Sequence, residues 1–95
     1  MDGWTNIKAK DGEFRAYVAK PSGQSKGAIV VIQEIFGVNA VMRHKCDWLA
    51  GEGFWALAPD LFWRIQPGID ITDQTEAEWS QAFDYMNRFD AMAGV

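Results

Sequence analysis

The sequence contains few residues that could carry out hydrolytic or metal chemistry, and the most reactive pair is badly spaced. His44 and Cys46 are the only histidine and the only cysteine in 95 residues. Residues two apart on a helix point about 200° away from each other, so this pair cannot act as base and nucleophile. A metal site would need further Cys or His ligands. We therefore expect Cys46 to be a small core residue, His44 to lie at the surface, and no metal to be bound.

Motifs for a hydrolase nucleophile and for a dinucleotide are not found in the required positions. A nucleophile in an α/β sheet occupies a sharp Gly-x-Ser-x-Gly turn, or its cysteine version, between a strand and a helix. The pentapeptide Gly23-Gln24-Ser25-Lys26-Gly27 has this pattern of residues but precedes a predicted strand, and no cysteine version occurs. Ser22 and Ser25 lie in a predicted turn, and Ser80 lies within a predicted helix. Gly51 and Gly53 end a predicted helix instead of opening one, so they do not form a dinucleotide-binding loop. We expect no cofactor.

Glu34 is the strongest candidate for chemistry because it directly follows a predicted buried strand. Open α/β sheets bind their ligands outside the carboxyl ends of the strands. The alternative is that the Glu34 carboxylate bonds to backbone amides or pairs with an arginine. Asp60 could likewise have a structural role, as a turn or cap residue, instead of a chemical one. Arg64 could pair with either carboxylate. A further hypothesis is a pocket for a small apolar ligand, lined by Phe36, Trp63, Trp79 and Phe83.

The elements that would position these residues are typical of the α/β class. Residues 4–9 and 13–19 flank Asp11-Gly12, which predicts an antiparallel hairpin at a sheet edge. The β-branched run in residues 28–32 predicts a strand buried on both faces, which is typical of a parallel sheet. A helix from Asn39 or Ala40 to Gly51 and a short buried strand over residues 54–59 complete a βαβ unit.

The last third of the chain is predicted to be a loop over residues 61–74 followed by one helix. Thr75 and Glu78 have capping-box spacing, so the helix is expected to begin near Thr75. Trp79, Phe83 and Met86 then recur at helical spacing and predict its apolar face. Together the elements predict one domain over residues 1–95, with a mixed sheet of about four strands.

Composition and charge restrict the partners and the location. The formal net charge is −4 and the basic residues are scattered, which argues against nucleic acid and anionic membranes. A single cysteine is consistent with a reducing compartment. The first six residues do not resemble a signal peptide, and no apolar run approaches the roughly 20 residues that span a bilayer. We expect a cytoplasmic protein.

Two motifs resemble the dienelactone hydrolase (carboxymethylenebutenolidase) family of α/β hydrolases. They are Gln33-Glu34-Ile35-Phe36-Gly37-Val38-Asn39 and Ala58-Pro59-Asp60-Leu61-Phe62-Trp63-Arg64. The resemblance runs over the whole chain but covers only the N-terminal part of that fold. It implies a truncated α/β-hydrolase fold whose cysteine, aspartate and histidine triad would follow Val95.

The resemblance also implies roles for individual residues. Glu34 matches the glutamate that contacts the nucleophilic cysteine at rest, and the Ile35 N–H matches one of two oxyanion-hole donors. Phe36, Trp63, Arg64, Trp79 and Phe83 become candidates for the substrate pocket. On the last helix the family has an arginine and a tyrosine for the substrate carboxylate, where this chain has Trp79 and Phe83.

Three hypotheses about function follow. The first is a dienelactone hydrolase-like protein, from a family that hydrolyses lactones or carboxylic esters, which is inactive alone because it lacks the triad. The second is a non-catalytic module that binds a partner or itself. Without the strand that the family places beside residues 28–32, this strand would have an open apolar edge, which predicts a homodimer or higher oligomer. The third is the small-ligand pocket, with an ester or lactone as its ligand.

Overall fold

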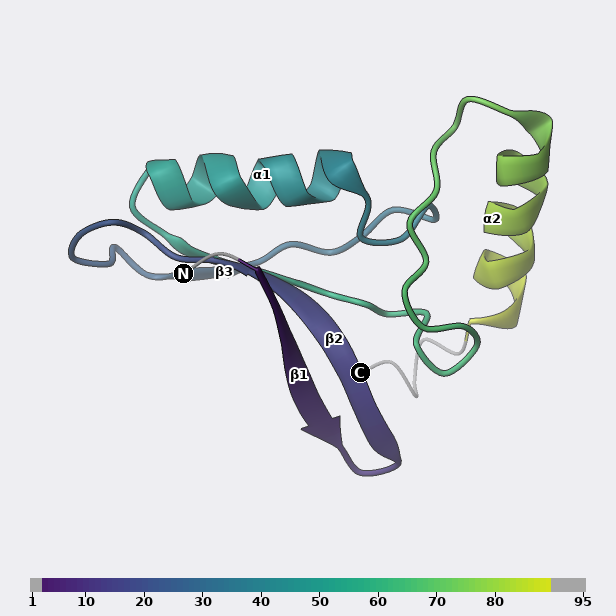
Figure 1. Ribbon diagram of the computed structural model, residues 1–95, viewed down its shortest axis with the longest axis horizontal. Coiled ribbons are helices and arrows are strands. Elements are labelled where there is room, and N and C mark those ends of the chain that lie inside the picture. Colours follow the sequence, from purple (N-terminus) through teal and green to yellow (C-terminus); the bar gives the residue numbers. More distant parts are fainter. Residues whose placement is uncertain (1–2, 90–95) are drawn as a thin grey trace.

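The computed structural model describes residues 3–89, which form a four-stranded mixed sheet and two helices (Figure 1). The elements are β1 (Gly3–Ala9), β2 (Gly12–Ala19), β3 (Ala28–Val30), α1 (Ala40–Gly51), β4 (Trp55–Pro59) and α2 (Glu76–Arg88). The strands lie in the order β1-β2-β4-β3, with β3 parallel to β4 and the other two pairs antiparallel. The predicted α/β class, the hairpin and the parallel βαβ unit are confirmed. Among residues 3–89, no helix has the length and apolar character to cross a membrane.

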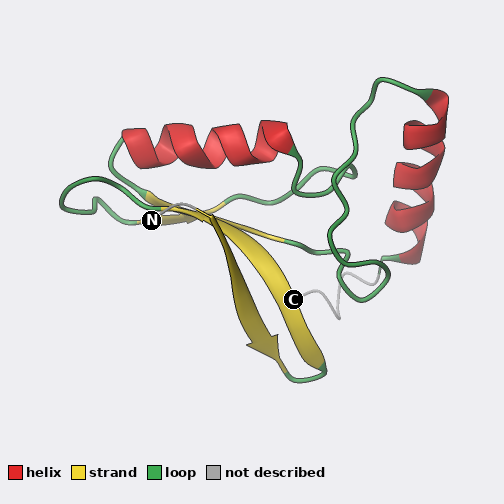
Figure 2. Cartoon of the chain, viewed as in Figure 1, coloured by secondary structure: helices red, strands yellow, loops and turns green. Residues whose placement is uncertain are grey.

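Helix α1 covers one face of the sheet (Figure 2). The contact is built from fully or nearly fully buried side chains: Ala19, Val38, Met42, Cys46, Ala50, Ala56 and Ala58. Four of these are alanines, so helix and strands can approach closely and fill the space without large side chains. The helix begins where Asn39 caps it, since the Asn39 Oδ1 accepts a hydrogen bond from the Met42 N–H at 3.2 Å. The predicted position of Cys46 in the core is confirmed.

The turn of the β1–β2 hairpin is attached to the loop that follows β4. Arg64 donates two hydrogen bonds to the Asp11 carboxylate, at 2.8 and 3.0 Å. The Trp63 ring stacks on Phe14 with centroids 5.5 Å apart. Gly12 leaves room for that ring, since a Cβ at this position would lie 2.9 Å from it. The expectation that Arg64 pairs with Glu34 or Asp60 is therefore wrong. The Arg64 guanidinium binds the Asp11 carboxylate at the hairpin turn instead.

Strand β3 differs from the strand predicted over residues 28–32. It has only three residues and forms the sheet edge, with β4 on one side and no strand of residues 3–89 on the other. The side chains of Val30 and Ile32 are exposed, by 59% and 62%. The prediction that this strand is buried on both faces is wrong, because α1 covers only the face that carries Val31. The predicted open edge is present in the described chain.

Helix α2 stands beyond the end of the sheet and packs on the loop that precedes it (Figure 1). Its buried residues are Ala82 and Tyr85, and Tyr85 packs with Phe62 and Ile69. The predicted apolar face is wrong, because Trp79, Phe83 and Met86 are 39–45% exposed. Their helical spacing is real, but among residues 3–89 no strand lies against that side of the helix. The predicted cap is confirmed, since the Glu78 N–H donates to the Thr75 hydroxyl at 3.1 Å.

Candidate functional site

A tight turn over residues 34–37, separated from the end of β3 by residues 31–33, positions Glu34 and Ile35 beyond the carboxyl end of the strand. The Gly37 N–H donates to the Glu34 carbonyl at 3.2 Å and closes the turn. Gly37 has φ +83°, a backbone conformation that residues with a side chain rarely adopt. A Cβ at this position would also overlap the carbonyl oxygen of Ile69. Glycine is therefore required both by the turn and by the close approach of the loop after β4.

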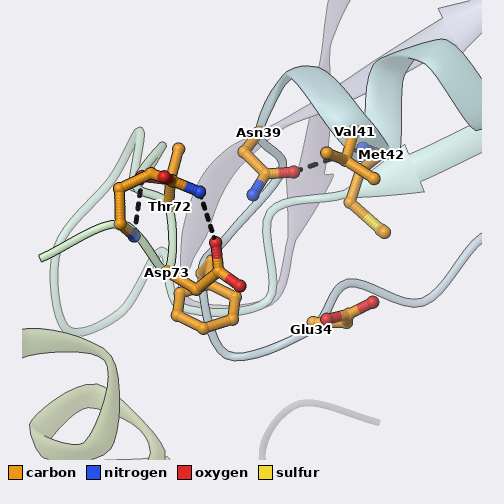
Figure 3. Close-up of a pocket in the computed structure, with 8 residues that line it drawn as sticks. Glu34, Asn39, Val41, Met42, Thr72 and Asp73 are labelled. Carbon is orange, nitrogen blue, oxygen red and sulfur yellow. Dashed lines mark hydrogen bonds between the residues drawn. The ribbon is translucent and has the colours of Figure 1, made fainter. Parts of the chain in front are cut away.

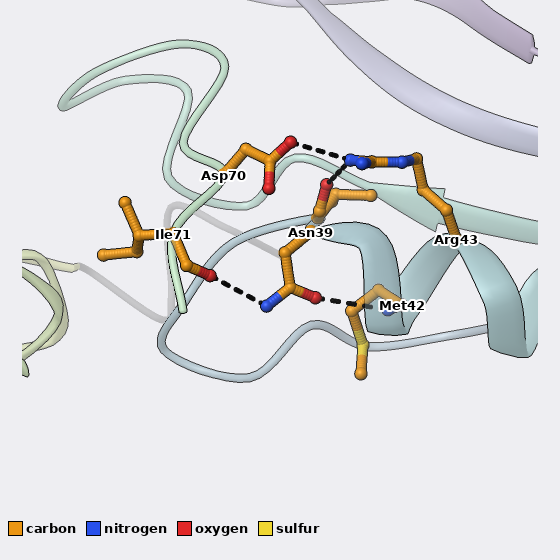
Figure 4. Close-up of polar contacts among 6 residues, drawn as sticks. Asn39, Met42, Arg43, Asp70 and Ile71 are labelled. Carbon is orange, nitrogen blue, oxygen red and sulfur yellow. Dashed lines mark hydrogen bonds and ion pairs between the residues drawn. The ribbon is translucent and has the colours of Figure 1, made fainter. Parts of the chain in front are cut away.

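Side chains on both sides of the turn fix it to the rest of the molecule, and Figure 4 shows the contacts made by those that follow the turn. Gln33 accepts a hydrogen bond from the Leu61 N–H at 2.8 Å. Asn39 Nδ2 donates to the Ile71 carbonyl at 2.9 Å. Arg43 donates to the Val38 carbonyl at 2.8 Å and to the Asp70 carboxylate at 2.9 Å. The turn is thus held by residues before it, after it and in the distant loop.

The Glu34 carboxylate is open to solvent and lines a cavity of about 260 Å³. Its side chain is 62% exposed, and its nearest cation is the Lys45 ammonium at 3.9 Å. Such an exposed pair is weak. The other side of the cavity is formed by the loop that precedes α2, and Glu34 lies apart from Thr72 and Asp73 there (Figure 3). The Glu34 carboxylate is therefore neither buried against backbone amides nor neutralised by an arginine.

The Ile35 N–H lies within the same turn, at its second position. Among residues 3–89 no hydrogen bond from this N–H is found. Ile35 and Glu34 both border a second cavity of about 220 Å³, whose other walls include Leu61, Phe62 and Met86. The turn therefore borders both a cavity of mixed polar and apolar lining and a largely apolar one. Glu34 lines both cavities, and its neighbour Ile35 lines the second.

Three of the predicted pocket aromatics come together, and the remaining two candidates do not join them. The Phe36 ring meets Trp79 edge-on with centroids 5.1 Å apart, and Trp79 stacks on Phe83 at 5.6 Å. The Trp79 indole N–H also donates to the Asp73 carbonyl at 2.9 Å. Trp63 and Arg64 instead lie at the hairpin turn, as described above. Among the five candidates, only Phe36 lines the cavity that contains Glu34.

The remaining reactive groups lie away from this turn. Cys46 is fully buried between α1 and the sheet, and burial raises the pKa of its thiol. His44 is exposed on α1. Asp60 is 2% exposed, and burial raises the pKa of its carboxyl although a hydrogen bond from the Gly68 N–H opposes this. Within the described residues, no group of three or more His, Cys, Asp or Glu side chains could hold a metal ion.

Sequence reasoning missed most of the residues that hold the turn. Asn39 could have been recognised as a cap, because asparagine is favoured immediately before a helix. Nothing in the sequence pattern indicates that Gln33, Arg43 or Asp70 reach distant backbone or charged groups. Their partners lie 27 or 28 residues away along the chain, so these contacts become visible only in three dimensions.

Comparison with known proteins places this arrangement in a family. Residues 14–93 match the model of the dienelactone hydrolase family. The chain is 58% identical over 81 residues to an Azospirillum brasilense protein named as a carboxymethylenebutenolidase, covering 84% of this chain and 35% of that one. It is 38% identical over 94 residues to carboxymethylenebutenolidase 1 of Cupriavidus pinatubonensis, covering 99% and 40%.

Comparison with solved structures supports the same family. A crystal structure from Klebsiella pneumoniae, described as a dienelactone hydrolase, matches with a TM-score of 0.61 and 30% identity, over 99% of this chain and 45% of that one. The chain thus spans about 35 to 40% of the length of these curated relatives. The family match covers most of the sequence and both motifs around the turn. The chain belongs to the dienelactone hydrolase family.

Proposed function

We propose that this chain forms one wall of a site that hydrolyses carboxylic esters or lactones. The observation that carries the proposal is the turn beyond the carboxyl end of β3. It holds the exposed Glu34 side chain and, at the next residue, an Ile35 N–H that makes no hydrogen bond among residues 3–89. Ligands of open α/β sheets bind at such ends. Membership of a hydrolase family adds to this support.

Each group has a separate role in the proposed wall. The Ile35 N–H would donate to the oxyanion that develops when a nucleophile attacks the ester carbonyl. A donor of this kind contributes about 3–4 kcal/mol to transition-state stabilisation in an assembled site. Glu34 would contact the nucleophile before attack and hold it in its resting state. Both roles require a nucleophile from outside residues 3–89.

The chain by itself is proposed to be inactive. Within residues 3–89, the buried Cys46 is the only thiol, and burial keeps its pKa above the ordinary value, which disfavours the reactive thiolate. His44 lies two residues away on the same helix and is exposed, so it is not placed to activate this thiol. Neither residue lines the two cavities that border Glu34.

The proposed substrate class is an uncharged ester or lactone. The cavity of about 260 Å³ is lined by two carboxylates, Glu34 and Asp73, and by no lysine or arginine. Arg43 lies close but donates to Val38 and Asp70. An anionic substrate would therefore meet repulsion without a compensating cation. The nearby rings of Trp79 and Phe83 offer apolar contacts instead.

A chimera tests the proposal directly. The matching segment of the Cupriavidus carboxymethylenebutenolidase would be replaced by this chain, and hydrolysis of p-nitrophenyl acetate measured. We expect the chimera to be active. Glu34→Gln should lower kcat/KM at least about tenfold, because kcat/KM is referred to the free enzyme, which would lose the contact that holds its nucleophile. Glu52→Gln, at the far end of α1, is the matched control. An active chimera that is insensitive to Glu34→Gln would overturn the proposal.

Two further measurements test inactivity and substrate class. The chain alone is expected to hydrolyse p-nitrophenyl acetate no faster than buffer, and turnover that is lost in Glu34→Ala would contradict this. In the chimera, Trp79→Arg is expected to raise kcat/KM for the monoanionic ester p-nitrophenyl hemisuccinate relative to the neutral acetate. An unchanged ratio would contradict the substrate assignment and leave the role of Glu34 standing.

A further inference from the structure

The free edge of β3 presents backbone groups in a regular pattern. The Gly27 carbonyl accepts from the Trp55 N–H at 2.9 Å, and the Val31 N–H donates to the Leu57 carbonyl at 2.8 Å. Alternate residues of a strand direct their backbone groups to opposite sides in the plane of the sheet. Because Gly27 and Val31 face β4, the N–H and C=O groups of Ala28, Val30 and Ile32 must face the open edge.

The same segment is apolar in the middle and oppositely charged at its two ends. Val30 and Ile32 expose 59% and 62% of their surface. Lys26 lies four residues before Val30 and Glu34 lies four residues after it. Glu34 has only the weak contact to Lys45 at 3.9 Å, in which both side chains are more than half exposed. Both charged ends of the segment are therefore accessible to a partner.

We propose that two copies of this chain pair through this edge, antiparallel, about a two-fold axis that passes through Val30. In this register Val30 faces Val30 of the second copy, and Ala28 faces Ile32. It is the one antiparallel register that pairs all three outward-facing residues. It also brings Lys26 of each copy to the end of the paired segment where Glu34 of the other copy lies, although the Lys26 N–H itself donates to the Gly53 carbonyl at 2.8 Å and not to the open edge. A second copy is favoured because the segment is complementary in charge to its own reversed sequence.

The geometry of such a dimer follows from the sheet order. The two-fold axis runs perpendicular to the sheet, so the four strands of each copy join into one continuous eight-stranded sheet with both α1 helices on the same side. The outward backbone groups of β3 have no partner among the described residues and are otherwise a template for uncontrolled pairing. In the dimer they become hydrogen bonded. This proposal does not depend on the hydrolase assignment.

Charge reversal tests the register. In sedimentation velocity of the 95-residue chain we expect a dimer at micromolar concentration. Lys26→Glu or Glu34→Lys brings like charges together at both ends of the paired segment, and should weaken dimerisation roughly tenfold. The double variant Lys26→Glu/Glu34→Lys keeps the wild-type net charge and should restore the dimer. Lys10→Glu, exposed at the hairpin turn, is the control that alters net charge alone.

Cysteine cross-linking gives a second, independent measurement. Directly opposed, hydrogen-bonded residues of antiparallel strands have Cα atoms about 5.5 Å apart, within the range of a disulfide. Val30→Cys should therefore form a covalent dimer on mild oxidation. Ile32→Cys should not, because each Ile32 faces Ala28. A monomeric wild-type chain would overturn the proposal and leave the edge to another segment or partner. A dimer that is indifferent to charge reversal would overturn the register.

Discussion

The side-chain amide of Asn39 joins two loops that are 32 residues apart in the sequence. Its Nδ2 donates to the Ile71 carbonyl at 2.9 Å, while its Oδ1 accepts from the Met42 N–H and caps α1. The Ile71 N–H in turn donates to the Phe36 carbonyl at 3.0 Å. One buried residue thus fixes the start of α1 and, through Ile71, the turn that carries Glu34.

Substitution of Asn39 is expected to be costly because two hydrogen bonds depend on it. Asn39→Ala removes the cap and leaves the Ile71 carbonyl without its donor, so the free energy of unfolding should fall by about 2 kcal/mol. Asn39→Ser keeps a capping oxygen and loses the amide donor to Ile71, and should cost less than Asn39→Ala. Urea unfolding followed by tryptophan fluorescence measures both. Asn6→Ala, on the exposed face of β1, should change stability little. Equal losses in the two Asn39 variants would contradict the dual role.

Gly37→Ala tests whether the turn tolerates a side chain. The residue has φ +83° and its Cβ would overlap the Ile69 carbonyl oxygen, so both the backbone conformation and the packing oppose the change. We expect the free energy of unfolding to fall by about 2–3 kcal/mol. Gly23→Ala is the matched control, since a Cβ at Gly23 would meet no atom within 4 Å. A Gly37→Ala chain as stable as Gly23→Ala would show that the turn can rearrange.

Local sequence signals predicted the elements well, because those signals act within a few residues. Asp11-Gly12 marked the hairpin, and Thr75 with Glu78 marked the start of α2, and both are found where expected. These devices depend on backbone conformation and on hydrogen bonds between near neighbours. They do not require knowledge of what packs against the element.

Burial was harder to predict, because it depends on what covers each element. The β-branched run at 28–32 indicated a strand buried on both faces, but in residues 3–89 only one face and one edge are covered. Helical spacing of Trp79, Phe83 and Met86 indicated an inward face, yet α2 buries Tyr85 against Phe62 instead. At the candidate site, Glu34 was found by its place after the strand, whereas Ile35 was named only through the resemblance to the family. The contacts that hold them are long-range and left no pattern in the sequence.

Asp60 should make the stability depend on pH in the direction opposite to most carboxylates. Burial raises its carboxyl pKa above 3.8, and Oδ1 has no hydrogen-bond partner among residues 3–89. The folded chain therefore holds this proton more tightly than the unfolded chain. Its contribution to stability is fully present below pH 3.8 and is lost as the pH rises through the folded pKa.

Asp60→Asn removes this titration and keeps an acceptor for the Gly68 N–H. The variant should be at least as stable as the parent at pH 7, and should lack the fall in stability that Asp60 causes above about pH 4. Urea unfolding at a series of pH values measures the difference. Asp11→Asn provides the contrast, since Arg64 lowers the pKa of Asp11 and its contribution is lost as the pH falls. A parallel pH dependence in parent and Asp60→Asn would contradict the assignment.

Helix α2 should open more readily than α1, because it buries little surface of its own. Within residues 3–89 it packs through Tyr85 and Ala82 on the preceding loop, and it leaves Trp79, Phe83 and Met86 exposed. Its first turn depends on Glu78, which accepts from the Thr72 N–H and hydroxyl, and these bonds lower its carboxyl pKa. Local stability follows buried contacts and protected hydrogen bonds, so amide exchange should be faster in α2 than in α1.

Glu78→Gln tests the source of that local stability. It keeps an acceptor for Thr72 but removes the charge near the positive end of the helix, so exchange in α2 should quicken while exchange in α1 stays unchanged. Hydrogen exchange followed by mass spectrometry resolves the two helices. Glu76→Gln, in the same first turn without a bond to Thr72, should have the smaller effect. Uniform acceleration in both helices would mean that α2 opens only with the whole domain.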